Sequence, residues 1–142
     1  MKIRMLKDID FSNGFIECLE ELGKVNTSIT DMMIIFKKRK KYGIKTFVIL
    51  DEKNSKVIAS ASIILEPKFR YTKNCCHLED VCVVKTHQNK GIGKILVNHI
   101  IQYVKNKKCY KIILNCSENN LNFYKKFGFF QHENSLRLDI TD

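Results

Sequence analysis

Hydrophobic and polar residues follow two periodicities along this chain, one typical of strands and one typical of helices. Strand-like runs, either alternating or continuously apolar, occupy residues 2–6, 46–50, 57–65, 77–84, 110–114 and 136–140. Apolar residues at helical spacing occupy residues 12–23, 30–42, 92–105 and 117–127. The predicted order of elements is therefore β-α-α-β-β-β-α-β-α-β.

Residues that favour helix ends set the boundaries of the first two helices. Ser12 is expected to cap the first helix, and Gly23 ends it. Thr30 is expected to cap the second, which stops at Gly43 after the cationic run 37–41. Cations in the last turn suit the helix dipole, so we interpret this run as structural rather than as a binding patch.

The order of the elements predicts the fold class. Neighbouring strands without a helix between them form antiparallel hairpins, whereas the β-α-β stretch over residues 77–114 forms a parallel crossover. We expect an α/β (α+β) protein with a mixed, mostly antiparallel sheet and helices on both faces. The length of 142 residues fits a single domain, 1–142.

The chain carries a formal net charge of +10. Such a charge indicates either a lysine-rich solvated surface or an anionic partner such as nucleic acid, a membrane surface or a phosphorylated small molecule. The lysines are scattered rather than interleaved with aromatic residues, which disfavours a nucleic-acid-binding module. No apolar run is long enough for a membrane span, and no signal-peptide pattern opens the chain, so we expect a cytoplasmic protein.

Six cysteines are present, and without a secretory signal we expect them to be reduced. Cys75 and Cys76 precede His77, but adjacent cysteines lack the spacing of zinc ligands and no second ligand pair follows. We therefore expect no metal.

A glycine-containing turn, Gln88–Lys94, opens the amphipathic helix at 92–105. Gly91 and Gly93 allow backbone N–H groups to converge at a helix N-terminus, which favours a pyrophosphate. The turn is not a Walker A loop, because Ile95 follows Lys94 where Ser or Thr is required. A dinucleotide fingerprint also fails, since its third glycine is missing.

Two spaced motifs resemble the GNAT family of N-acetyltransferases over essentially the whole chain. They are Gln88-x-x-Gly91-x-Gly93 and Asn120-x-x-Phe123-Tyr124-x-x-x-Gly128-Phe129. Three further segments are similar to the members that acetylate glucosamine 6-phosphate: Leu78-Glu-Asp-Val81, Cys109–Leu114 and Asn122–Phe129. The resemblance implies a GNAT fold and the transfer of acetyl from acetyl-CoA to the 2-amino group of that sugar, a step toward UDP-N-acetylglucosamine, by direct attack in a ternary complex.

Acyl transfer from a thioester requires residues that bind the cofactor. The backbone of 88–94 can hold the diphosphate, and the strand backbone of 81–83 can pair with the pantetheine arm and polarise the carbonyl. With the positions that the resemblance adds, the expected acetyl-CoA residues are Val81, Cys82, Val83, Gln88, Asn89, Lys90, Gly91, Ile92, Gly93, Lys94, Asn120, Tyr124 and Lys126.

The chemistry also requires a base for the amine and an acid for the thiolate. Glu79 and Asp80 are the candidate bases. Adjacent strand residues point to opposite faces, so both reach one site only if the strand bulges or one acts through its backbone. Tyr124 is the candidate acid, because a phenol matches a departing alkyl thiolate better than a carboxylic acid does. Which carboxylate acts stays open.

Cations and hydroxyls at family positions are expected to bind the sugar phosphate. The resemblance implies Thr27, Lys68, Arg70, Tyr71, Glu79, Asp80, Tyr110 and Lys111 as substrate residues. Tyr71 stands where relatives carry histidine, Asn115 replaces an acidic residue, and Arg137 is a further phosphate partner to consider. The resemblance also implies a homodimer in which the last strand and parts of the pocket cross between subunits. The alternative is a GNAT enzyme for another amine: a polyamine, an aminoglycoside or a protein N-terminus.

Overall fold

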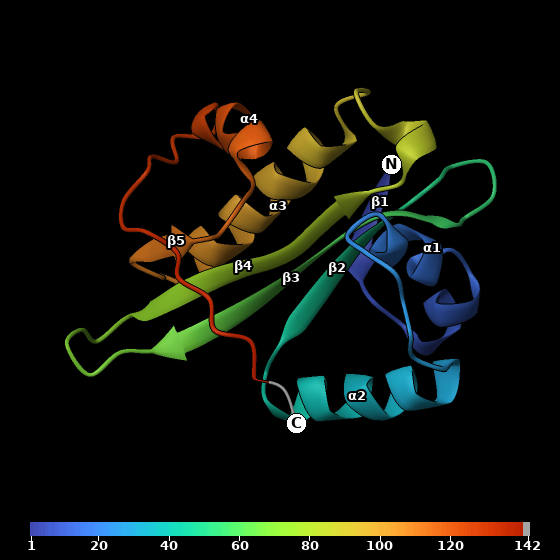
Figure 1. The fold of residues 1–142 in the computed structure, drawn as a ribbon, viewed down its shortest axis with the longest axis horizontal. Coiled ribbons are helices and arrows are strands. Elements are labelled where there is room, and N and C mark those ends of the chain that lie inside the picture. The colour runs from blue at the N-terminus through green and yellow to red at the C-terminus, as the bar shows by residue number, and fades with distance from the viewer. Residues whose placement is uncertain (141–142) are drawn as a thin grey trace.

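The computed structural model describes residues 1–140, which form a five-stranded sheet flanked by helices (Figure 1). The strands lie in the order of the chain: β1 (Lys2–Met5), β2 (Lys45–Leu50), β3 (Val57–Pro67), β4 (Asn74–Val83) and β5 (Lys111–Ile113). β1 to β4 pair antiparallel, and β4 pairs parallel with β5. The predicted mixed, mostly antiparallel sheet is confirmed.

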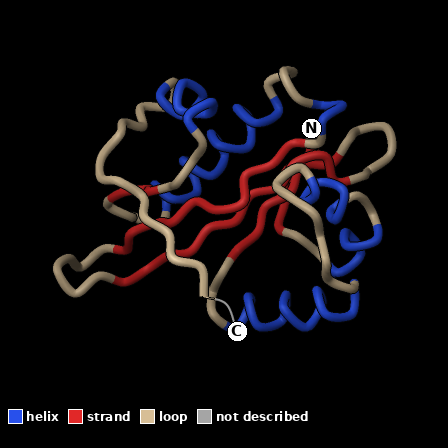
Figure 2. Tube along the Cα trace, in the orientation of Figure 1, coloured by secondary structure: helices blue, strands red, loops and turns tan. Residues whose placement is uncertain are grey.

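The helices cover both faces of the sheet (Figure 2). The α-helices are α1 (Phe15–Glu20), α2 (Ile29–Lys41), α3 (Ile92–Asn106) and α4 (Leu121–Lys125). Short 3₁₀ helices occupy Asp8–Ser12, Lys85–His87 and Glu118–Asn120. Among residues 1–140, none of these helices has the length and apolarity that crossing a bilayer requires.

Two separate clusters of buried side chains hold these layers together. The apolar stripe of α3, which includes Leu96 and Ile100, packs on one face of the sheet with Ile63 and Leu78. On the other face, the buried side chains of α1 and α2 meet those of β2 and β3, together with Cys82 of β4. The alternation of side chains along each strand feeds both clusters, as expected for a sheet covered on both faces.

The first two helices begin at residues other than those predicted. Gly14 precedes α1 with φ at +95°, and Ser12 ends the 3₁₀ helix instead of capping α1. A Cβ at Gly14 would lie 2.7 Å from the carbonyl oxygen of Val57, so close packing on β3 requires glycine there. The cap of α2 is Ser28, whose side chain accepts from the backbone N–H of Asp31 at 3.1 Å, not Thr30.

The predicted sixth strand at 136–140 does not form in the single chain. These residues are irregular, and Leu136, Leu138 and Ile140 are 95%, 82% and 87% exposed. Their alternating apolar pattern is that of a strand, but a strand is stable only against a partner edge and a covering surface. The prediction of a strand at 136–140 is therefore wrong for residues 1–140, because apolar alternation alone does not supply a paired edge.

Asp10 carries a fully buried carboxylate at the start of the chain. Arg4 donates to both of its oxygens, at 2.7 and 2.8 Å, and the backbone N–H of Lys7 donates to Oδ2 at 2.8 Å. Burial opposes ionisation, but these hydrogen bonds outweigh it and hold the pKa of Asp10 below its ordinary value.

Replacing Asp10 with asparagine is therefore expected to lower the free energy of unfolding at pH 7 by about 3 kcal/mol. Because the pKa of Asp10 is depressed in the folded state, its contribution is present above the ordinary aspartate pKa and is lost as pH falls through the folded value. Urea unfolding of the wild type and Asp10→Asn at pH 7 and at acid pH should show the difference shrinking with acid. The exposed Asp8→Asn is the control, and an Asp10 variant as stable as this control would contradict the prediction.

Candidate functional site

β4 and β5 pair over a short distance and then separate. The parallel register joins Cys75 with Lys111 and His77 with Ile113, and it ends there. After β5 the chain turns away toward α4 (Figure 1). Within the part of the chain that the structure describes, the edge of β4 from Leu78 to Val83 therefore has no strand beside it. Its backbone groups are available to an extended ligand.

The free edge of β4 leads directly to the N-terminus of α3. Gly91 precedes α3 with φ at +79° and offers no side-chain cap. The first bond of the helix runs from the N–H of Ile95 to the carbonyl of Gly91 at 3.1 Å, so the amides of residues 92–94 have no acceptor within the helix. Gln88 ties the turn to β4 by donating from Nε2 to the carbonyl of Val83 at 2.8 Å. This end of α3 suits an anion.

α4 packs against the same turn. A Cβ at Gly93 would approach Cζ of Phe123 to 3.2 Å, so glycine lets α3 and α4 lie close together. At the start of α4, Asn120 is exposed, and Lys126 follows the helix in the solvent. Both predicted acetyl-CoA positions therefore lie on the outer surface beside the turn, where a ligand on the free edge of β4 could reach them.

Tyr124 is the one buried residue of α4, with 9% of its surface exposed. Its ring meets Phe123 and Phe129 edge-on at 5.0 and 5.9 Å between centroids. Burial, with a smaller effect of nearby Cys116, raises the pKa of Tyr124 to about 12. Tyr124 is also one of the residues that line a cavity of about 750 Å³ between β5, α4 and residues 127–135. Because its pKa is raised, the phenol keeps its proton at neutral pH.

A bulge interrupts β4 at the two candidate carboxylates. Ser62 of β3 lies opposite Glu79, and Ser60 lies opposite Cys82, so two residues of β4 face the single intervening residue of β3. Asp80 adopts φ at +52°, a left-handed conformation that a residue with a side chain rarely adopts. The structure therefore contains the bulge, which is one of the two alternatives that the sequence left open for Glu79 and Asp80.

Asp80 and Thr27 meet at a cavity of about 150 Å³ between the sheet and the first two helices. Apolar side chains, mainly from α1 and α2, form about half of its wall, and Ser60, Ser62 and Arg39 add polar groups. Both carboxylates are exposed, but Asp80 lines this cavity and Glu79 does not. The two adjacent carboxylates therefore have different surroundings.

Arg39 is a site residue that the sequence analysis missed. Its Nη2 donates to Ser62 Oγ at 2.7 Å and to Thr46 Oγ1 at 3.3 Å, and the two hydroxyls lie 2.9 Å apart. The sequence analysis interprets the cationic run 37–41 as structural rather than as a binding patch. Helical spacing from the buried Met32 and Phe36 places Arg39 on the face toward the sheet, a signal that could have found it.

The remaining predicted substrate residues gather at the other end of β3 and β4. Lys68 pairs with Glu66 at 2.8 Å, and the rings of Tyr71 and Tyr110 stack with centroids 4.4 Å apart. Arg70 and Lys111 lie over these rings, at 5.7 Å from the centroid of Tyr71 and 5.3 Å from that of Tyr110. We call these five residues, 68, 70, 71, 110 and 111, the hairpin cluster.

The hairpin cluster and the cavity are far apart within one chain. Ser62 lies beside the cavity, and Lys68 follows six residues later along β3, a span of about 20 Å at the usual rise of a strand. A phosphorylated monosaccharide is much shorter than that. The predicted substrate residues are thus brought together in two groups and not in one. Arg137 belongs to neither, since it is exposed and pairs with Asp139 at 2.6 Å.

A free strand edge, a bulge and an uncapped helix N-terminus in succession on β4 and α3 define a site for an extended, anionic acyl carrier. The chain belongs to the acetyltransferase (GNAT) family, whose model matches residues 13–129. It is accordingly an acetyltransferase that takes its acetyl group from acetyl-CoA.

Within this family, the chain is similar to enzymes named for a single substrate. A glucosamine 6-phosphate N-acetyltransferase of Trypanosoma brucei brucei is 34% identical over 145 residues, covering 99% of this chain and 96% of that protein. The Arabidopsis thaliana enzyme of the same name is 38% identical over 134 residues, covering 89% and 88%. A crystal structure of glucosamine-6-phosphate N-acetyltransferase from Arabidopsis thaliana superposes with a TM-score of 0.92 at 32% identity, covering 99% of this chain and 98% of that one.

Proposed function

We propose that this protein, as a single domain over residues 1–142, transfers the acetyl group of acetyl-CoA to the 2-amino group of D-glucosamine 6-phosphate. The products are N-acetyl-D-glucosamine 6-phosphate and CoA, and the reaction serves UDP-N-acetylglucosamine synthesis in the cytoplasm. The observation that carries the substrate assignment is the near full-length similarity to relatives bearing this name. The β4 edge and the α3 N-terminus support the acetyl-CoA half of the reaction.

Acetyl-CoA lies along the free edge of β4 in this proposal. The backbone at 81–83 pairs with the pantetheine arm, and one of its amides polarises the thioester carbonyl. Amides of the turn at 88–94 hold the diphosphate, while Asn120 and Lys126 contact the carrier from α4. Cys82 takes part through its backbone only, because its thiol is buried against Cys18 with the two sulfurs 3.3 Å apart.

The gap between β4 and β5 lets the two halves of the reaction meet. The amine enters from the cavity side, and its nitrogen attacks the thioester carbonyl carbon. Asp80, which lines that cavity, orients the amine and accepts a proton as the C–N bond forms. Tyr124, on the α3 side of the sheet, donates its proton to sulfur as the C–S bond breaks. The neutral amine and the thioester of acetyl-CoA are thereby converted into an amide and the free thiol of CoA.

The sugar phosphate requires a second subunit in this proposal. The hairpin cluster lies about 20 Å from Asp80 within one chain, so a homodimer would bring the partner's hairpin cluster over the cavity. The exposed alternating residues Leu136, Leu138 and Ile140 support such an association, since a strand of this pattern needs a second surface. Thr27 and Glu79 then contact the sugar ring, and the hairpin cluster contacts its phosphate.

A mixture of two inactive variants is expected to regain activity if the site is shared in this way. Asp80→Asn removes the base of one half-site, and Lys111→Met removes a cation of the other. After subunit exchange of equal amounts, half of the dimers are mixed, and each restores one intact site, giving about one quarter of wild-type activity. Recovery is measured by thiol release before and after exchange. Two variants that stay inactive after proven exchange would place both groups in one subunit's site.

The proposed function itself is tested by identifying the product. The protein is incubated with acetyl-CoA and glucosamine 6-phosphate, and the sugar is analysed by mass spectrometry and proton NMR. The expected product carries one acetyl group on nitrogen at carbon 2. Acetylation on oxygen, or none at all with active protein, would overturn the assignment.

A further inference from the structure

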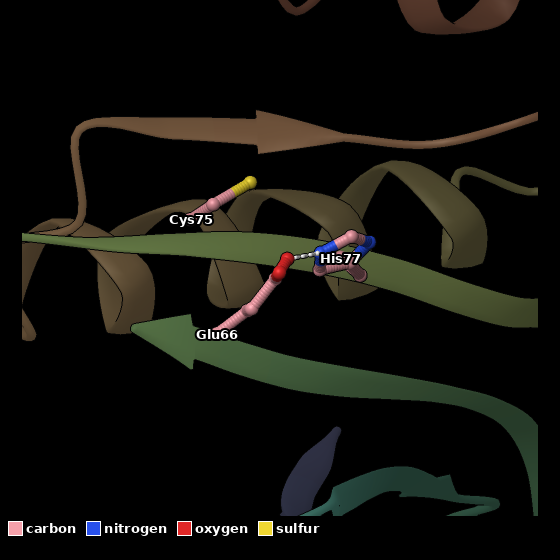
Figure 3. A group of neighbouring side chains, drawn as sticks. All are labelled: Glu66, Cys75 and His77. Carbon is pink, nitrogen blue, oxygen red and sulfur yellow. Dashed lines mark hydrogen bonds and ion pairs between the residues drawn. The ribbon is translucent and has the colours of Figure 1, made fainter. Parts of the chain in front are cut away.

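Three potential metal ligands lie together on one face of the sheet, outside the residues that the proposed reaction uses. They are Glu66 of β3 and Cys75 and His77 of β4 (Figure 3). Glu66 is directly opposite Cys75 in the antiparallel register, and Cys75 and His77 are two residues apart, so all three side chains point to the same face. Their ligand atoms all lie within 4.8 Å of one another.

The three side chains already face one another. Nε2 of His77 lies 2.5 Å from Oε2 of Glu66, and Figure 3 shows this contact with the Cys75 thiol on the same side. The other oxygen of Glu66 accepts from Lys68 at 2.8 Å, which fixes the carboxylate as a supporting hydrogen bond fixes a metal ligand. Cys75 is buried, whereas the side chains of His77 and Glu66 are 28% and 40% exposed, so a cation can enter from solvent.

From this geometry we infer that Glu66, Cys75 and His77 form a binding site for a thiophilic divalent cation, Zn²⁺. One thiolate, one imidazole and one carboxylate are the ligand types of zinc, and three protein ligands leave a fourth position for water. Ligand atoms around a zinc ion lie roughly 3.3–3.6 Å apart, so His77 Nε2 and Glu66 Oε2, now 2.5 Å apart, must separate by about one ångström for an ion to sit between them and the thiol. Rotation of the half-exposed Glu66 side chain accommodates this.

The site cannot be recognised from the sequence, because its third ligand, Glu66, comes from another strand. Cys75, Cys76 and His77 alone lack zinc spacing, and Cys76 points to the opposite face, into the core beneath α3. Glu66 joins Cys75 and His77 only through the register of β3 and β4. The earlier expectation of no metal rested on spacing along the chain, which carries no information about this pairing.

The two lysines beside the site affect its affinity for a divalent cation. Lys68 contacts Glu66, and Lys111 lies beside Cys75 in the β4–β5 register. Both favour the Cys75 thiolate, against the burial that raises the pKa of this thiol, but both also repel a divalent ion.

Binding of Zn²⁺ to the reduced, full-length protein is measured by isothermal titration calorimetry, with Co²⁺ as an optical probe. We expect one ion per chain and a sulfur-to-cobalt charge-transfer band. Cys75→Ala should weaken binding by at least about 100-fold, since even loss of a supporting partner costs 10–100-fold. The matched control, Cys76→Ala, removes the neighbouring thiol on the opposite face and should bind as the wild type does.

Glu66→Gln, at a half-exposed position, provides a variant that keeps the fold should Cys75→Ala not do so, and it should also lose affinity. Absence of binding to the wild type, or equal affinity in Cys75→Ala or Glu66→Gln, would overturn the inference. These readouts do not depend on any acetyl transfer. If the proposed function holds, Zn²⁺ should also inhibit acetylation, because it would bind Glu66, the hydrogen-bond partner of Lys68 in the hairpin cluster. The Cys75→Ala variant should resist this inhibition.

Discussion

Replacing Tyr124 with phenylalanine is expected to lower kcat for acetyl transfer by roughly 10²–10³-fold, with the affinity for acetyl-CoA nearly unchanged. In the proposed mechanism the phenol donates a proton to the leaving thiolate; it is buried, and burial raises its pKa to about 12. It therefore stays protonated throughout the neutral range and is ready to protonate a departing thiolate. Phenylalanine keeps the ring contacts with Phe123 and Phe129 and removes only the hydroxyl.

The measurement is steady-state thiol release together with a direct binding assay for acetyl-CoA. Tyr103→Phe is the control, because Tyr103 is half-buried and also has a raised pKa but lies on α3 against Phe47. Because the pKa of Tyr124 is raised, loss of its proton should not lower kcat of the wild type between pH 7 and 9. A Tyr124 variant with wild-type kcat would remove this residue from the chemistry.

Replacing Asp80 with asparagine is expected to lower kcat by roughly 10²–10⁴-fold, while Glu79→Gln should lower it only a few-fold. Both carboxylates are exposed at the bulge in β4, but only Asp80, with φ at +52°, lines the cavity together with Thr27. In the proposed mechanism the amine lies in this cavity, and Asp80 takes its proton.

The two variants are compared at saturating acetyl-CoA, so that kcat and the KM for the acceptor are resolved separately. Circular dichroism and thermal unfolding check that the bulge survives each substitution. A large kcat loss in Glu79→Gln with little effect in Asp80→Asn would reverse the assignment of the base.

The sequence predicts the parts of this protein that depend on local pattern. The strand at 77–84, the glycine turn and the helix after it follow from apolar spacing and from Gly91 and Gly93, and the structure has them in place with β4 beginning earlier, at Asn74. The bulge is one of the two alternatives that the adjacent Glu79 and Asp80 left open, the other being a role for one residue's backbone.

What the sequence could not predict depends on pairing between distant segments. Arg39 reaches Thr46 and Ser62 across the interface of a helix and the sheet, and Glu66 meets His77 only through strand register. The separation between Lys68 and Asp80 likewise follows from the length of the β3–β4 hairpin. The residues expected to form a strand at 136–140 pair with no strand among residues 1–140, which local apolar alternation does not reveal.

The most direct test of the account is a comparison of amine acceptors. Thiol release from acetyl-CoA is measured with glucosamine 6-phosphate, glucosamine and spermidine at matched concentrations. Cationic groups built to pair with a phosphate discriminate strongly against an acceptor that lacks it, so kcat/KM for glucosamine 6-phosphate should exceed that for glucosamine by at least about 100-fold. Equal values for the two sugars, or a preference for spermidine, would contradict the proposed substrate and leave an acetyltransferase of another amine.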